Sequence, residues 1–456
     1  MISLLILAGL FAASAALTVM RSAVQALVWV YLPSTILLLQ VPMLDIPLLP
    51  DPNQRIACIY GILAGMALRG GRTRLFRWNL LDSLLVTLAV LRVLTALFTE
   101  KIWTGVSASG DLALGWIVPY LLARQLFYDP RSRRDAVICL SLVMTFVGLV
   151  TLIELRVAPF AYSRLLEPLG IVRAANTFVY HRFGLFRPQV GFAHPIDLGN
   201  SALILASMLA IFAVTSGVGL KHKLVRLGLA ATIGTAVASL SFTSYVGIAA
   251  ASLIFVSLYY LPALRLLIVP SILAAVIAAA VFTATLLSVN LKEFVPEPGS
   301  VEASLWVRTL IVQNSWTYAE QAGLFGFGKT IGRKDLDLDS VDNSYMLFLI
   351  RYGWLYLVVW IVMVLSLASR AARALSVSSR DEHRIPVIAA VAGLGGTLAA
   401  MYTVWFGFAF ETLFILLLGL SNSMFEVLVT RMAPQSARQD GAMAMALPTS
   451  LAGGLR

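Results

Sequence analysis

The hydrophobic positions of the chain fall into long runs that short polar segments separate. A membrane-spanning helix needs roughly 17–25 predominantly apolar residues, and the sequence contains about thirteen runs of this kind. Because a span must satisfy its backbone hydrogen bonds internally, these runs predict an all-α, polytopic transmembrane helix bundle of about 12–14 spans. The runs cover residues 2–20, 24–41, 55–68, 80–99, 112–128, 135–154, 197–216, 224–240, 243–261, 265–288, 343–367, 385–405 and 409–429.

Composition agrees with a membrane protein and excludes a chain built around one aqueous core. Hydrophobic residues make up 59% of the sequence and charged residues 12%, whereas soluble domains usually carry about 25% charged residues. The net charge of +11 comes from short basic clusters between the apolar runs, which is the pattern of a topology signal. We therefore expect a phospholipid bilayer as a partner and no nucleic acid.

The basic clusters also predict which side of the membrane each loop occupies. They lie in one set of alternate loops, at 69–77, 131–134, 221–226 and 370–384. Lysine and arginine are enriched in cytoplasmic loops, so the N-terminus is predicted to be periplasmic and the C-terminus cytoplasmic.

Two long loops, 155–196 and 290–342, then lie outside the cytoplasm, and both belong to a single integral membrane domain over residues 1–432. The small, polar and patternless stretch 433–456 predicts a disordered cytoplasmic tail.

The first outer loop is basic and rich in aromatic residues. Guanidinium groups hold phosphate oxygens through paired hydrogen bonds, so the loop suits an anionic partner such as a pyrophosphate leaving group. An interfacial helix whose arginines contact lipid headgroups is the alternative, and these residues alone do not separate the two. The acids here are few, Glu154 and Glu167, and the cations are Arg156, Arg164, Arg173, Arg182, Arg187, His181 and His194.

The second outer loop has the pattern of a helix followed by a glycine turn. A rough apolar stripe from Leu305 to Trp316 predicts the helix, with Arg308 offset from the stripe. Gly323, Gly326 and Gly328 then permit tight backbone turns. Further on, DLDLDS at 335–340 is similar to the metal-binding DxD of nucleotide-sugar transferases, but it lacks the glycine and terminal glutamate of a calcium loop. We interpret it as a solvated turn or a counter-charge to the preceding basic pair, and we expect no metal site.

Ionisable residues inside spans suggest function by default. Asp82 and Arg124 lie near cytoplasmic span ends, where long side chains can extend to the interface. Five others are placed to meet beneath the outer loops, as a substrate site or as structural ion pairs between helices. They are Arg92, Arg351, Asp342, Glu411 and Asp197.

Residues 186–204, FRPQVGFAHPIDLGNSALI, resemble the segment that enters a central span in the bacterial O-antigen ligase and Wzy-type polysaccharide polymerase family. The matching positions are Arg187, Gly191-Phe192 and His194-Pro195. The spacing from Arg173 to Gly184 is also similar to an Arg-x10-Gly pattern of polymerase outer loops.

The second outer loop resembles the same family in four features that occur in order. These are an arginine in a tryptophan-containing helix, a Gly-x-Gly turn, the stretch Asp342-Asn343-Ser344-Tyr345, and Gly353 in the following span. Two positions depart from the family pattern. Tyr245 stands where many members have an arginine, and Asp342 stands where ligases usually have a histidine, which favours the polymerase branch.

The resemblance implies a metal-independent glycosyltransferase of the bacterial inner membrane, with no cofactor. It would join oligosaccharide repeat units linked to undecaprenyl pyrophosphate, at the periplasmic face, with the lipid pyrophosphate as leaving group. Arg187 and Arg308, then Arg173 and Arg182, would stabilise the departing diphosphate, and His194 and Asp342 are the candidates for a general base. Further substrate contacts are assigned to Arg351, Asn343, Tyr345, Arg92 and Glu411.

A chain-length regulator and export machinery are the protein partners that this interpretation implies. Three alternatives remain. An O-antigen-ligase-type enzyme would transfer a finished glycan to a lipid or protein acceptor. A transporter or flippase for lipid-linked glycans would have inverted repeats and broken helices, and neither is evident in the sequence. A structural assembly protein is the third.

Overall fold

The computed structural model describes residues 2–38, 53–70, 77–99, 102–167, 179–288, 301–328, 343–378, 380–403 and 408–445. Three of the predicted site residues fall outside this part of the chain. Arg173 and Asp342 lie outside the described residues altogether, and the side chain of Arg308 does too.

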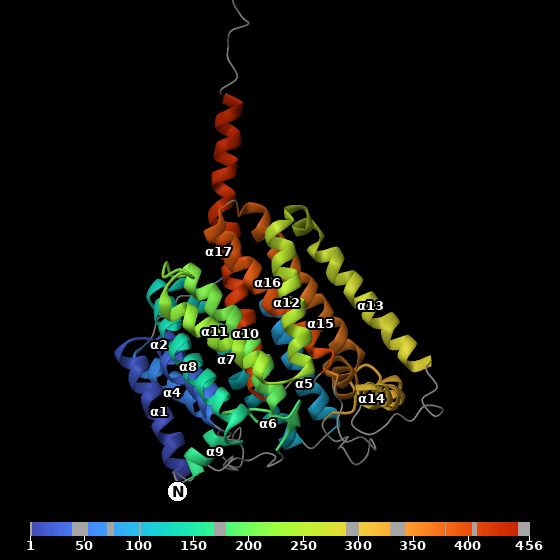
Figure 1. Cartoon of the computed structure of the whole chain (residues 1–456). Helices are drawn as coiled ribbons and strands as arrows, with labels where there is room; N and C mark the ends of the chain where they lie inside the picture. The colour runs from blue at the N-terminus through green and yellow to red at the C-terminus, as the bar shows by residue number, and fades with distance from the viewer. Residues whose placement is uncertain are drawn as a thin grey trace, which may run out of the picture.

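The chain folds into an all-α bundle of membrane-spanning helices (Figure 1). Within the described residues, nine helices are long and apolar enough to cross a membrane. The principal helices are α1 (Ile2–Met20), α4 (Gln54–Leu68), α5 (Leu80–Thr99), α7 (Val118–Tyr128), α8 (Pro130–Arg156), α10 (Pro195–Thr215), α11 (Lys223–Ala238), α12 (Phe242–Tyr260), α13 (Ile268–Ser288), α15 (Ser344–Val377), α16 (Asp381–Met401) and α17 (Phe408–Met445).

Every predicted apolar run contains helix, so the predicted fold class is confirmed. The second run is divided into α2 (Ala23–Ala26), a π-helical turn η1 (Leu27–Tyr31) and α3 (Leu32–Leu37). The fifth run, 112–128, lies in a helical stretch that begins earlier than predicted and combines α6 (Ile102–Leu112), a second π-helical turn η2 (Ala113–Ile117) and α7. Between α11 and α12, Leu240 has a φ of 50°. This left-handed residue ends one helix and lets the next begin at once.

Helices α10 and α17 form the centre of the bundle. Helix α10 packs against α8, α11, α12, α16 and α17, and α17 also packs along α7. Small residues allow the closest approach, as where α12 crosses α16. A Cβ added at Gly396 would lie 2.5 Å from the carbonyl oxygen of Gly247. Most of the buried hydrophobic residues form one cluster between these helices, with smaller clusters beside it.

The described parts of both outer loops lie at one end of the bundle. Figure 1 shows α9 (Ala161–Leu166) and α14 (Val301–Gln321) at the same end as the N-terminus, while α17 leaves from the opposite end. Helix α17 continues to Met445, into the segment predicted to be a disordered tail; residues 446–456 lie outside the described part of the chain.

Helix α14 buries a different stripe from the one that the sequence indicates. Among the side chains of α14 that the structure describes, the buried ones are Val312, Ser315 and Ala319. Of these, Val312 and Ala319 pack on Met346, Leu349 and Ile350 of α15.

Helix α15 is broken at Gly353, where φ is 80° and ψ is 179°. The glycine turn of the second outer loop fills the break. The amides of Phe327 and Gly328 donate to the carbonyls of Ile350 and Arg351, both over 2.9 Å, and the amides of Trp354 and Leu355 donate to Gly323 and Leu324 over 3.1 and 3.3 Å. The predicted turns at Gly323, Gly326 and Gly328 are confirmed, since all three have positive φ.

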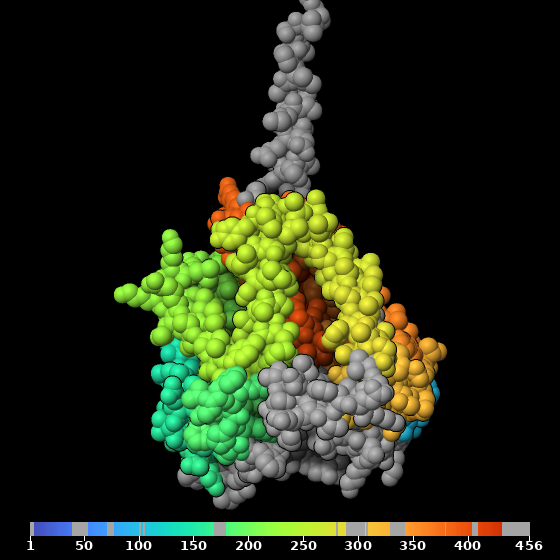
Figure 2. All heavy atoms as spheres, turned by 45° about the vertical axis from the view of Figure 1, so that its right-hand side comes forward, coloured from blue at the N-terminus to red at the C-terminus, as the bar shows by residue number. Residues whose placement is uncertain are grey.

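Helix α13 stands away from the rest of the bundle. Only 6% of the residues in its apolar 18-residue stretch are buried inside the protein. The short helix η4 (Pro262–Leu267) joins it to α12, and the two helices diverge from that connection (Figure 1). Figure 2 shows a hollow between them, through which the orange to red helices of the C-terminal third are visible. The bundle wall is therefore open to the side at this place.

At the end of the bundle opposite the outer loops, Arg124 and Asp82 form a buried ion network. Arg124 is fully buried and pairs with Asp82 and Glu426, while the hydroxyl of Tyr120 donates to Asp82 over 2.7 Å. Asn422 also donates to Asp82, over 3.2 Å. The expectation that Asp82 and Arg124 extend to the interface was wrong, because oppositely charged partners on facing helices compensate their burial.

Candidate functional site

The described part of the first outer loop contains a small β-hairpin. Its strands are β1 (His181–Arg182) and β2 (Leu185–Phe186), which pair antiparallel with His181 opposite Phe186. The two residues between the strands, Phe183 and Gly184, both have positive φ, as two-residue hairpin turns favour. The amide of Arg187 then donates to the carbonyl of Tyr180 over 2.8 Å. The hairpin therefore places Arg187 directly beside Tyr180.

Arg182 and Arg187 reach the carbonyl groups at the end of α11. Nη1 of Arg182 donates to Leu240 over 2.9 Å, and Nε of Arg187 donates to Ser239 over 3.4 Å. The hydroxyl of Tyr245 donates to the nearby carbonyl of Val237 over 2.9 Å. Cations are favoured at a helix C-terminus, where the last carbonyls lack partners. These contacts fix the direction of both arginines.

Within the described part of the chain, neither arginine has an acidic partner, because no carboxylate lies within ion-pair distance of either guanidinium. Burial, and then the charge of Arg182, lower the pKa of Arg187 to about 10. Arg187 thus remains charged at neutral pH in a place that disfavours its charge. A bound anion would relieve that cost.

His194 also contacts Tyr180. Its ring is edge-on to the Tyr180 ring with centroids 4.9 Å apart, and the guanidinium carbon of Arg187 lies 5.7 Å from the same Tyr180 ring. His194 is the N-cap of α10, where Nδ1 accepts from the amide of Ile196 over 3.1 Å. In the neutral ring, the proton is then on Nε2. We call Tyr180, Arg182, Arg187 and His194 the loop cluster.

Asn343 and Tyr345 have structural contacts at the start of α15. Oδ1 of Asn343 caps the helix by accepting from the amides of Tyr345 and Met346, over 3.0 and 3.1 Å. The hydroxyl of Tyr345 donates to Leu398 of α16 over 2.8 Å. These bonds fix the first turn of α15, immediately after the position of Asp342.

Arg92 and Glu411 form an ion pair, with 2.9 Å between Nη1 and Oε1. The indole of Trp116 donates to the same Glu411 oxygen over 2.8 Å. The Arg92 guanidinium carbon lies 4.6 Å from the Trp116 ring centroid and 4.9 Å from that of Tyr352. This geometry matches the alternative of a structural ion pair between helices.

Arg351 is half-buried one residue before Tyr352. Within the described residues no carboxylate pairs with it. An arginine without a counter-charge in a span is a functional candidate. Its position beside the Gly323–Gly328 turn places it at the outer-loop end of the bundle.

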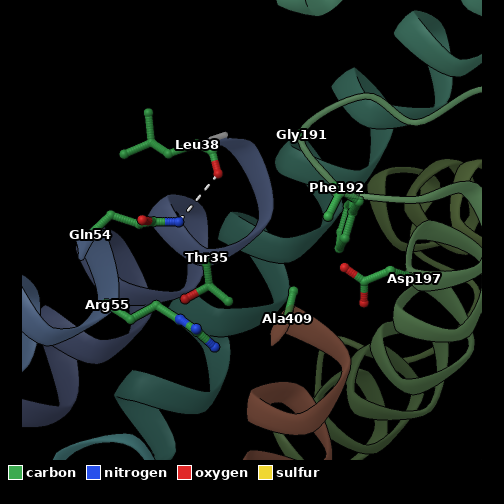
Figure 3. Close-up of a pocket in the computed structure, with 9 residues that line it drawn as sticks. Thr35, Leu38, Gln54, Arg55, Gly191, Phe192, Asp197 and Ala409 are labelled. Atoms are coloured by element: carbon green, nitrogen blue, oxygen red, sulfur yellow. Dashed lines mark hydrogen bonds between the residues drawn. The ribbon is translucent and has the colours of Figure 1, made fainter. Parts of the chain in front are cut away.

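Asp197 faces a small pocket near the loop cluster (Figure 3). The pocket contains about 300 Å³ of space, part of it open to solvent. Arg55 and Asp197 lie on facing sides. Arg55 donates to Thr412, while Asp197 accepts from the amide of Phe410 over 3.1 Å. The lining residues are Thr35, Leu38, Gln54, Arg55, Gly191, Phe192, Ala193, Asp197 and Ala409.

The predicted charges beneath the loops therefore meet only in part. Glu411 belongs to the first turn of α17, and Asp197 accepts a hydrogen bond from Phe410 in the same turn. Glu411, however, pairs with Arg92. Arg182, Arg187 and His194 form a separate group on the first outer loop. In the described part of the chain, no three His, Cys, Asp or Glu side chains come together as metal ligands would.

The chemistry of the loop cluster is that of an anion-binding surface with one imidazole. Two guanidinium groups supply positive charge, and Nε2–H of neutral His194 supplies a hydrogen-bond donor. No family model matches the chain, and no curated protein is similar to it in sequence.

Proposed function

We propose that the chain is a membrane glycosyltransferase that joins lipid-linked oligosaccharide repeat units into a polysaccharide. The site is the loop cluster, at the periplasmic face of a bacterial inner membrane. The likeness of residues 186–204 and of the second outer loop to the O-antigen ligase and polymerase family supports this proposal. A chain-length regulator and export machinery are proposed partners.

The observation that carries the proposal is the pair Arg182 and Arg187, which has no carboxylate partner among the residues that the structure describes. A diphosphate ester carries negative charge, and that charge increases on the leaving group as the glycosidic bond breaks. Preorganised cations in a partly dry site stabilise such charge more in the transition state than in the ground state. The lowered pKa of Arg187 means that its charge is poorly solvated before the anion arrives.

In the proposed reaction, an acceptor hydroxyl attacks the anomeric carbon of the donor sugar. The bond from that carbon to the pyrophosphate oxygen breaks, and the oxygen leaves with the electron pair. Arg187 and Arg182 neutralise the leaving group, and Nε2–H of His194 donates to it. The proton of the acceptor hydroxyl passes to a base, for which Asp342 is the candidate on the sequence.

The side opening between α12 and α13 supports a lipid-linked substrate (Figure 2). Helix α12 begins at Phe242, directly after the carbonyls that Arg182 and Arg187 bind. A hydrocarbon chain in the opening would remain in the bilayer while its diphosphate reaches the arginines. This arrangement keeps the reacting groups at the membrane surface.

The test is polymerisation by the purified chain in lipid nanodiscs, with lipid-linked repeats extracted from cells that lack it. We expect a ladder of products from the wild type. Removing one oxyanion donor typically lowers kcat by about 10²–10³, so Arg187→Ala should lose about 100-fold and Arg187→Lys less. Arg164→Ala, on an exposed residue of the same loop, is the matched control.

The product distribution separates the alternatives. Transfer of one glycan to a different acceptor without a ladder would indicate the ligase, and full activity of Arg187→Ala would remove the loop cluster from the reaction.

A transporter of lipid-linked glycans is a second candidate, favoured by one observation. Helix α15 is broken at Gly353, and broken helices occur at transporter binding sites. However, four backbone bonds from the Gly323–Gly328 turn occupy the break. Movement of a fluorescent lipid-linked glycan across proteoliposomes, without a new glycosidic bond, would favour the transporter.

A further inference from the structure

Glu154 is a buried carboxylate at the outer end of α8, and its side chain accepts three backbone hydrogen bonds. One oxygen accepts from the amide of Tyr162 over 3.1 Å. The other accepts from the amides of Gln189 and Val190, over 2.8 and 2.9 Å. Glu154 is only 1% exposed, and no cation among the described residues pairs with it. The three amides are therefore what compensates its charge.

The conformation of Gln189 and Val190 is unfavourable without the hydrogen bonds to Glu154. Val190 is β-branched and has a φ of 50°, a conformation that such residues rarely adopt. The buried side-chain amide of Gln189 has no hydrogen-bond partner among the described residues. Backbone strain and an unpaired buried amide both destabilise the segment. The hydrogen bonds to a charged acceptor, which are among the stronger ones in proteins, offset these costs.

The same segment is fitted closely against α3. A Cβ added at Gly191 would lie 2.7 Å from the carbonyl oxygen of Ile36 and 2.9 Å from that of Leu37. The hydroxyl of Tyr162 donates to Leu37 over 2.7 Å. Glu154, through Tyr162 and Val190, thus joins α9 and the loop to the same point of the bundle.

From these contacts we infer that Glu154 is a positioning residue for the loop cluster. Arg187 lies two residues before Gln189, and His194 lies four residues after Val190. Because the amides of Gln189 and Val190 are hydrogen-bonded to Glu154, the backbone that carries Arg187 and His194 is held in place. This inference rests on the proposed function for its catalytic consequence, but the backbone contact itself can be tested separately.

Hydrogen–deuterium exchange of the full chain in detergent measures the contact directly. In Glu154→Ala we expect the amides of Tyr162, Gln189 and Val190 to exchange at least tenfold faster than in the wild type. Glu154→Gln keeps one acceptor oxygen for Gln189 and Val190 but turns an NH₂ toward Tyr162. It should therefore accelerate mainly the Tyr162 amide. Glu167→Gln, on an exposed carboxylate of the same loop, should change nothing.

Amides within α10 are the internal reference, because a general loss of structure would accelerate them as well. Unchanged exchange at Gln189 and Val190 in Glu154→Ala would overturn the inference, whatever the activity. The activity measurement is the kcat and KM of polymerisation by Glu154→Ala, with Glu154→Gln as the conservative variant. We expect kcat of Glu154→Ala to fall about tenfold with KM nearly constant, and Glu154→Gln to retain most of the wild-type kcat because it keeps the acceptor for Gln189 and Val190. Faster exchange with unaltered kcat would instead contradict the role of the loop cluster in the proposed reaction.

Discussion

The ring of Tyr180 lies edge-on to the imidazole of His194, with centroids 4.9 Å apart. Tyr180 also contacts Arg187, through the backbone at 2.8 Å and the ring at 5.7 Å. One aromatic residue therefore contacts both the cation and the imidazole. This relationship makes Tyr180 a site residue that the sequence did not indicate.

Tyr180→Phe should preserve polymerisation, because the ring makes both contacts. Tyr180→Ala should lower kcat by about tenfold, since it removes an aromatic pair and a cation–π contact worth about 1–2 kcal/mol together. The measurement is kcat per folded protein, with folding checked by thermal unfolding in detergent. Equal activity of the Ala and Phe variants would show that the two ring contacts are irrelevant.

Inorganic pyrophosphate should raise the thermal unfolding temperature of the wild type, because a ligand that binds only the folded state stabilises it, by about 2.7 kcal/mol at 100 times Kd. Arg187→Ala and Arg182→Ala should lose most of this shift, and Arg164→Ala should keep it. Sulfate at equal ionic strength controls for non-specific salt effects. The same shift in all variants would exclude the arginine pair as the binding site.

Pyrophosphate binding should weaken at high pH. Burial and the charge of Arg182 lower the pKa of Arg187 to about 10, and only the charged form binds an anion. Between pH 8 and pH 10.5, Kd measured by calorimetry should rise about fourfold. The intrinsic effect on stability has the opposite sign. Between pH 10 and 12.5 the unfolded state binds more protons at this residue, so the cost of burying Arg187 decreases as pH rises.

Removing either partner of the Arg92–Glu411 pair should destabilise the bundle. Breaking a fully buried pair costs about 3–5 kcal/mol, and because about a fifth of each side chain is exposed we expect about 2 kcal/mol. The double variant Arg92→Ala/Glu411→Ala should lose less than the sum of the two single variants. Unfolding temperatures close to the wild type in both single variants would instead favour a substrate contact.

Gly353→Ala should undock the turn that fills the break in α15. A left-handed φ costs an alanine about 1–2 kcal/mol, and at Gly353 the new Cβ would also clash with the carbonyl of Leu324. Gly184→Ala is the matched control, because Gly184 also has a positive φ but open space around it. We expect Gly353→Ala to lower the free energy of unfolding by about 2 kcal/mol more than Gly184→Ala does. Its unfolding temperature should therefore be the lower of the two. Equal effects would contradict the close contact.

Topology can be tested with single cysteines. A cysteine at Phe183, which is 83% exposed, should react with a membrane-impermeant maleimide in intact cells. One at Arg380 should react only after permeabilisation, since the positive-inside rule places it in the cytoplasm. The native Cys58 and Cys139 are buried, so they give little background. The reverse pattern would invert the predicted orientation.

Hydropathy predicted the helices well because each span is a local property of about twenty residues. The glycine turn at 323–328 was also predicted, since positive φ depends mainly on residue type. Contacts between segments that are distant in the sequence were not predicted. Glu411 is 319 residues from Arg92, and no periodicity indicates that Trp116 donates to the same carboxylate.

Glu154 gave even less signal, because a glutamate at the end of an apolar run looks like an ordinary interfacial charge. Its role depends on three amides up to 36 residues away. The burial of Arg124 was missed for the same reason: its counter-charges Asp82 and Glu426 come from other helices.

The break in α15 affects how this chain enters the bilayer. Residues 323–328 leave the ribosome before the helix whose missing backbone partners they supply. Unpaired amides and carbonyls in hydrocarbon cost several kcal/mol each, so the outer half of α15 is not a self-sufficient insertion unit. Its stable integration requires the preceding turn to arrive with it, which makes the second outer loop part of the biogenesis of the membrane domain.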